Sequence, residues 1–116
     1  MHELSVVLEA IKQVEDYARS NGISGSIQVL TLRIGELSSI VPDYVRAVYT
    51  AATDGTILEN SNLEIEIAPA SARCEACGKI FMIVPNKGLC PACGGKDIKL
   101  LGGREFFIKE ITVSEE

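Results

Sequence analysis

The apolar residues near the N-terminus recur every three or four positions. They are Leu4, Val7, Leu8, Ile11, Val14 and Ala18. The other face carries the charged residues Glu9, Lys12, Glu15, Asp16 and Arg19. One apolar and one polar face predict an amphipathic helix. The helix should end near Ser20-Asn21-Gly22, because asparagine and glycine adopt the left-handed conformation that commonly follows a last helical turn.

The next segment, residues 26–35, alternates with a period of two. Leu30, Leu32 and Ile34 fall on one side of this segment. Val29, Thr31 and Arg33 fall on the other. This pattern predicts a strand with one buried face, closed by Gly35.

A second helical pattern follows the strand. Val41, Val45, Val48 and Ala52 are spaced at helical intervals. Pro42 has the backbone angle that suits a first helical turn, and Asp54-Gly55 supplies the stop. We expect Tyr44 and Tyr49 of this helix to belong to the core.

Two more strands are predicted in the second half of the chain. Residues 63–67 alternate cleanly between apolar and acidic side chains, whereas residues 104–113 form a strand whose register the pattern leaves open. The order of elements indicates an α+β (mixed α/β) fold, in which a small three-stranded sheet is covered by two helices. A cysteine-containing segment is inserted before the last strand.

That segment contains two CxxC turns, Cys74-Glu-Ala-Cys77-Gly and Cys90-Pro-Ala-Cys93-Gly, with twelve residues between them. Each turn can place two thiolates on one edge of a tetrahedral ion. Two turns complete the four-coordinate site and leave no position for water, which is typical of structural zinc. The glycine after each second cysteine lets the chain reverse there. The segment therefore resembles a zinc ribbon.

Four cysteines at this spacing have two other known uses in proteins. A dithiol redox centre is disfavoured, because a cycling CxxC usually lies at a helix N-terminus and neither turn precedes a helical pattern. An iron–sulfur cluster on the same thiolates stays open. The large apolar side chains of residues 71–98 are Ile80, Phe81, Met82, Ile83, Val84, Leu89 and Ile98. This is too small a core to stand alone, so metal binding should be part of the folding of the segment.

Composition narrows the class of protein. With 116 residues and 47% hydrophobic content, the chain can bury one main core. No apolar run approaches the roughly 18 residues of a membrane span, and no secretory pattern opens the chain, so we expect a cytoplasmic protein with reduced cysteines. The formal net charge of −5 disfavours a nucleic-acid partner. The alternative function is a zinc ribbon that binds nucleic acid or a protein complex. Only the formal net charge of residues 71–98, which is +2, supports this alternative.

The single histidine of the chain, His2, directly follows the terminal residue. A terminal amine, the next amide nitrogen and an imidazole at position two can close two fused chelate rings, which suits the nitrogen-rich square-planar preference of Ni(II) or Cu(II). Glu3 adds a carboxylate within reach. An exposed histidine ahead of a helix is the ordinary alternative. No Ser-His-Asp set, phosphate-binding loop or dinucleotide pattern is present, so no enzymatic activity is predicted.

Taken in order, these features resemble the HypA/HybF family of hydrogenase nickel-incorporation proteins. The resemblance is carried by Met1-His2-Glu3-Leu4-Ser5, by Arg33-Ile34-Gly35-Glu36-Leu37-Ser38, by the cysteine spacing, and by Gly103-Arg104-Glu105 with Ile108-Lys109. It runs from the first residue to the last. The opening tripeptide and the cysteine spacing are its most specific parts.

The resemblance implies a nickel metallochaperone for [NiFe]-hydrogenase, and in some relatives for urease. A protein of this family would deliver Ni(II) to the hydrogenase large subunit with the help of the accessory GTPase HypB. The implied nickel site is Met1, His2 and Glu3, and the implied structural Zn(II) site is Cys74, Cys77, Cys90 and Cys93. Asp43 is a possible extra nickel contact whose local spacing does not align. The implied domains are a nickel-binding domain of residues 1–70 and 99–116 and an inserted zinc-binding subdomain of residues 71–98. The sequence leaves open whether the protein is a monomer or a homodimer.

Overall fold

The computed structural model describes residues 3–114 of the chain, so the predicted nickel ligands Met1 and His2 lie outside the described residues. By internal contacts the chain divides into two compact units. The first unit consists of the N-terminal part of the chain as far as Arg33, of Ser39–Glu66, and of the part from Phe107 onward. The second unit consists of Ile34–Ser38 and Ile67–Phe106. Neither helix in this part of the chain combines the length and hydropathy that crossing a lipid bilayer requires.

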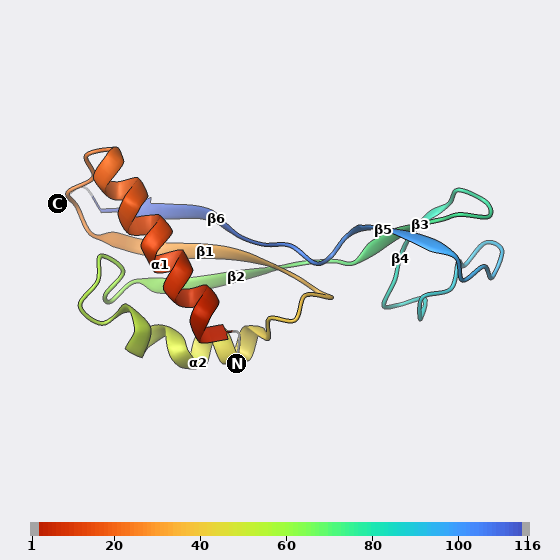
Figure 1. Ribbon diagram of the computed structural model, residues 1–116, viewed down its shortest axis with the longest axis horizontal. Coiled ribbons are helices and arrows are strands. Elements are labelled where there is room, and N and C mark those ends of the chain that lie inside the picture. The colour runs from red at the N-terminus through yellow and green to blue at the C-terminus, as the bar shows by residue number, and fades with distance from the viewer. Residues whose placement is uncertain (1–2, 115–116) are drawn as a thin grey trace. The chain divides into compact units, whose positions relative to one another are not determined.

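The first unit is built on two helices and three strands. The helices are α1 (Glu3–Ser20) and α2 (Pro42–Thr53), and the strands are β1 (Ile27–Gly35), β2 (Asn62–Ala68) and β6 (Phe106–Val113). The strands form one sheet in the order β2-β1-β6 (Figure 1). The predicted fold class, a small three-stranded sheet with two helices, is therefore confirmed.

The hydrogen bonds give the strand directions in this sheet. Ser26 accepts from the Ser114 amide and Gly35 donates to Glu105. Because the sum of the paired residue numbers stays constant, β1 and β6 run antiparallel. Figure 1 shows β1 and β2 running in the same direction. The parallel pair is connected through α2, as a crossover between parallel strands requires.

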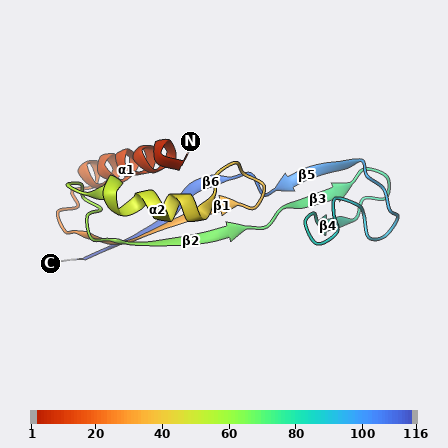
Figure 2. The same ribbon diagram turned by 90° about the horizontal axis from the view of Figure 1, so that it is seen from below.

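Both helices cover the same face of the sheet (Figure 2). The buried apolar residues here include Val7, Ala10, Ile11, Val14 and Ala18 of α1, Ile27, Leu30, Leu32 and Ile34 of β1, and Val45 and Tyr49 of α2. The predicted inward face of β1 is thus confirmed.

The predicted apolar stripes of the helices are broader than the buried ones. Leu4 and Leu8 of α1 are exposed, as is Tyr44 of α2. At 100° per residue, Leu4 and Leu8 lie on the flank of the stripe centred on Val7 and Val14, where the helix surface turns toward solvent. The expectation that Tyr44 belongs to the core was wrong. Tyr49, five residues further along the same helix, is buried as expected.

The second unit contains a separate three-stranded antiparallel sheet. Its strands are β3 (Ser71–Cys74), β4 (Ile80–Met82) and β5 (Ile98–Gly102), in the order β4-β3-β5. The pattern of apolar residues predicted none of them, because they are too short to show a period. Their core consists of Ala72, Cys74, Phe81 and Cys90, with Ile83 and Ile98 packed against it. Ile80, Met82, Val84 and Leu89 are exposed, so the small core expected of this segment is observed.

Candidate metal centre

The four cysteines lie in two turns that repeat the same backbone pattern. The Gly78 amide donates to the Cys74 carbonyl oxygen, and the Gly94 amide donates to the Cys90 carbonyl oxygen, both at 2.8 Å. The amide of each first cysteine donates to a carbonyl five residues on, at 2.9 Å in both turns.

Gly78 and Gly94 have φ angles of 81° and 74°, a left-handed conformation that glycine adopts without steric cost. The predicted reversal after each second cysteine is therefore present.

These turns bring all four sulfur atoms together. The Sγ atoms of Cys74 and Cys93 are 3.6 Å apart, as are those of Cys77 and Cys90, and all four lie within 4.8 Å of one another. A zinc–sulfur bond of about 2.3 Å gives an edge of about 3.8 Å in a regular tetrahedron. All four cysteines are free thiols, and the observed separations exceed the length of a disulfide bond. The donor set therefore fits one tetrahedral ion.

The electrostatics of the thiols also indicate a shared site. Burial raises the pKa of the Cys90 thiol, but hydrogen bonds from the backbone amides of Cys93 and Ala92 and from neighbouring thiols outweigh burial and lower the pKa to about 7. At Cys93 the Gly95 amide lowers the pKa, yet the surrounding thiols raise it to about 12. One thiol of the group thus ionises more easily than an ordinary cysteine and another less easily, because they share hydrogen bonds, and a bound dication would favour the thiolate form of both.

Gly95 is part of this centre, and the sequence patterns did not single it out. A Cβ atom on Gly95 would lie 3.3 Å from the sulfurs of both Cys74 and Cys93, which is a tight contact. The available signal was the double glycine after Cys93, since a lysine occupies the corresponding second position after Cys77.

The predicted N-terminal site is described only at Glu3. This residue is buried, with 5% of its surface exposed, and its Oε2 accepts a hydrogen bond from the Val41 amide at 3.0 Å. Asp43, the possible extra contact, lies in the first turn of α2 and is exposed. The structure therefore brings the four cysteines together and leaves the nickel ligands a prediction.

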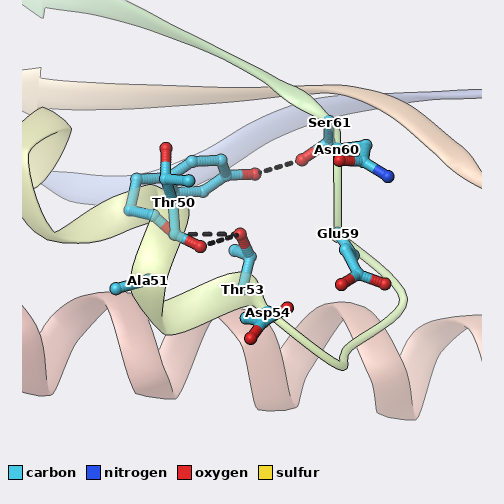
Figure 3. A pocket seen from close by; sticks show the side chains of 8 residues that line it. Thr50, Ala51, Thr53, Asp54, Glu59, Asn60 and Ser61 are labelled. Atoms are coloured by element: carbon cyan, nitrogen blue, oxygen red, sulfur yellow. Dashed lines mark hydrogen bonds between the residues drawn. The ribbon is translucent and has the colours of Figure 1, made fainter.

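Within residues 3–114, the four cysteines are the one group of three or more His, Cys, Asp or Glu side chains placed to hold a metal ion. A pocket of about 300 Å³ lies at the C-terminal end of α2 (Figure 3). Its Tyr49 and Ser61 hydroxyls are 2.6 Å apart, and the Thr53 hydroxyl donates to the Tyr49 carbonyl at 2.9 Å. These groups satisfy one another and so stabilise the end of the helix.

Comparison with known proteins adds the family. Residues 1–113 match a family model described as "Hydrogenase/urease nickel incorporation, metallochaperone, hypA". The hydrogenase maturation factor HypA of Streptomyces avermitilis is 38% identical over 112 residues, covering 96% of this chain and 86% of its own. The HypA of Chlorobium limicola is 38% identical over 115 residues, covering 99% and 98%.

Solved structures agree on the fold. A solution structure of the Ni metallochaperone HypA from Helicobacter pylori matches with a TM-score of 0.68 at 23% identity and covers all of both chains. A second solution structure, of a HypA protein, matches with a TM-score of 0.73 at 23% identity and covers 100% of this chain and 98% of the other. The predicted resemblance is thereby confirmed: the chain belongs to the HypA family of nickel-incorporation metallochaperones, which acts in hydrogenase maturation.

Proposed function

We propose that the protein binds Ni(II) at its N-terminus and delivers it for maturation of [NiFe]-hydrogenase, while Cys74, Cys77, Cys90 and Cys93 hold a structural zinc ion. The observation that carries this proposal is the family match. Its description names nickel incorporation, and it begins at residue 1, so it includes the tripeptide Met1-His2-Glu3.

The proposed nickel site consists of Met1, His2 and Glu3. The terminal amine, the His2 amide nitrogen and the imidazole supply the nitrogen donors that Ni(II) prefers in a square-planar arrangement. Terminal amines and imidazoles have reference pKa values of about 7.7–8.0 and 6.5, so protons compete for the site as the pH falls. Such a site can release its ion, as a chaperone must.

The proposed zinc site is different in chemistry. Soft thiolates favour zinc, and four of them leave no position open for water or for a transferred ligand. The assignment of residues 71–98 as the zinc-binding subdomain and of residues 1–70 and 99–116 as the nickel-binding domain follows from this proposal. Zinc supplies structure here and nickel is the cargo.

The proposed partners are the accessory GTPase HypB and the large subunit of [NiFe]-hydrogenase, in the cytoplasm. The family description names urease beside hydrogenase, so urease is a second candidate recipient. A direct comparison of nickel transfer to a hydrogenase precursor and to apo-urease, each with and without HypB, would identify the recipient.

Calorimetric titration of three zinc-loaded, nickel-free proteins with Ni(II) tests the nickel site. The proteins are the native chain, His2→Ala, and the native chain with its terminal amine acetylated, all checked for one zinc per chain. The native protein should bind one nickel ion, and both variants should bind it at least tenfold more weakly, because each loses a chelate ring. Equal affinity in all three would refute the N-terminal site.

A further inference from the structure

The first turn of α2 has no cap of its own. Val41 is the N-cap residue, with an extended conformation (φ −94°, ψ 116°) and a side chain that accepts no hydrogen bond. In a capping box, a Glu or Gln three positions later accepts the hydrogen bond from the N-cap amide. That position in α2 is Tyr44, which has no carboxylate or amide to reach back with. The Val41 amide must find its acceptor elsewhere.

Glu3 provides the missing acceptor from 38 residues away in sequence. Its Oε2 lies 3.0 Å from the Val41 amide nitrogen, and its side chain is buried. A carboxylate loses much of its hydration on burial and needs compensation. The amide hydrogen bond gives part of this, and the partial positive charge at the start of α2 gives more.

We propose that the Glu3 carboxylate caps α2 and thereby positions the nickel-binding tripeptide, rather than binding nickel itself. This inference rests on the proposed function, because it concerns the third residue of the proposed site. Glu3 is joined to His2 by a peptide bond, so fixing Glu3 fixes the end of the chelating segment and lowers the conformational entropy that nickel binding costs. A carboxylate that turned toward the metal would give up the Val41 amide.

Three variants separate a capping role from a ligand role. Glu3→Gln keeps a carbonyl oxygen for the Val41 amide, and Glu3→Ala removes the acceptor. Val41→Pro removes the donor and leaves the Glu3 carboxylate in place. Proline suits this position, because the φ angle of Val41 is within about 30° of the value that proline imposes and the Val41 side chain is exposed. Glu9→Gln is the matched control, the same change at an exposed carboxylate of α1.

Nickel titration gives the first readout. Glu3→Gln and Glu9→Gln should bind Ni(II) within about twofold of the native protein, with the same nickel absorption spectrum. Glu3→Ala and Val41→Pro should each bind about threefold to tenfold more weakly, the equivalent of a lost cap. A double variant that combines Glu3→Ala with Val41→Pro should bind Ni(II) no more weakly than either single variant, because both changes remove the same hydrogen bond. Native-like binding by Val41→Pro, together with equal losses in Glu3→Gln and Glu3→Ala, would make Glu3 a ligand and overturn the inference.

Amide exchange in the nickel-free, zinc-loaded protein gives a readout that does not depend on nickel. Protection of the Val41 amide should be kept in Glu3→Gln and Glu9→Gln and should fall about tenfold in Glu3→Ala. Unchanged protection in Glu3→Ala would overturn the cap. If the native protein bound no nickel at its N-terminus while Val41 protection still depended on Glu3, the proposed function would fail and the cap would stand.

Discussion

Gly35 and Gly103 meet backbone to backbone. A Cβ atom on Gly35 would lie 2.2 Å from the carbonyl oxygen of Gly103, far inside any normal contact. The same oxygen accepts the Leu37 amide at 2.7 Å, and the Gly35 amide donates to the Glu105 carbonyl at 2.6 Å. Gly103 itself has a φ of 117°, and a Cβ there would lie 2.5 Å from the Ala70 Cα. Both positions therefore require glycine, the first for space and the second for space and conformation.

Gly35→Ala should destabilise the protein by about 1–3 kcal/mol, because the added methyl group forces the two backbones apart. Denaturant unfolding of the zinc-loaded protein measures the change. Gly102→Ala is the matched control, since the nearest atom to a Cβ at that position is 3.9 Å away. Equal stability of Gly35→Ala and the native protein would show that the close approach does not exist in solution.

Removal of the metal with a chelator should loosen the cysteine-containing unit. The buried core around Ala72, Phe81 and the two buried cysteines is small, so the proposed ion should contribute much of the folding free energy of this unit. Amide exchange in residues 74–93 should accelerate by orders of magnitude, whereas amides of α1, which belong to the larger core, should stay protected. Persistent slow exchange in residues 74–93 after metal removal would contradict a folding role for the metal.

The sequence predicted the elements whose periodicity and stop signals are strong. α1 ends at Ser20, immediately before Asn21 and Gly22, and α2 ends at Thr53, immediately before Asp54. β2 was predicted because apolar and acidic side chains alternate over residues 63–67. The cysteine cluster was predicted because two CxxC pairs at this spacing are typical of four thiolates that share one ion, although the spacing left the identity of the ion open.

Other features depend on contacts that the sequence does not encode locally. β3, β4 and β5 have four, three and five residues, and their pairing depends on each other and on the cysteine turns. The contact between Glu3 and Val41 joins residues that nothing in the sequence connects, since a glutamate at the start of a helix usually faces solvent. Gly35 was recognised as a strand end, but the opposing backbone of Gly103 was not foreseen.

Glu66 should ionise at lower pH than an ordinary glutamate. A hydrogen bond from Lys109 lowers its pKa from 4.5, with a smaller contribution from Arg33, and together they outweigh partial desolvation. Because the pKa is lower in the folded protein than in the unfolded chain, the stabilisation is present above the unfolded pKa and is lost as the pH falls through the folded pKa. Side-chain carboxyl NMR measures this titration. Lys109→Met should raise the Glu66 pKa more than Arg33→Met does, and the reverse order would assign the main contact to Arg33.

Tyr49 and Ser61 form a relay, here meaning a chain of two hydrogen bonds, that joins α2 to the loop before β2. The Ser61 hydroxyl donates to the Leu58 carbonyl at 2.5 Å, so its hydrogen is committed, and the Tyr49 hydroxyl donates to the Ser61 oxygen at 2.6 Å. Tyr49 is buried, and burial raises its pKa above 10, an effect that the hydrogen bond with Ser61 partly offsets. The two substitutions that break the relay should therefore have unequal costs.

Tyr49→Phe removes one hydrogen bond and leaves Ser61 bonded to Leu58, so it should lower the free energy of unfolding by about 1 kcal/mol. Ser61→Ala also removes the donor to Leu58 and leaves the Tyr49 hydroxyl without this acceptor, so it should cost about 1–3 kcal/mol and raise the Tyr49 pKa further. The double variant should be no less stable than Ser61→Ala, because the hydroxyl that lacks a partner is then gone. Tyr44→Phe, an exposed change on the same helix, is the control and should leave stability unchanged. Thermal unfolding of the four variants decides the matter: a Tyr49→Phe cost larger than that of Ser61→Ala would mean that the tyrosine acts through packing and not through the relay.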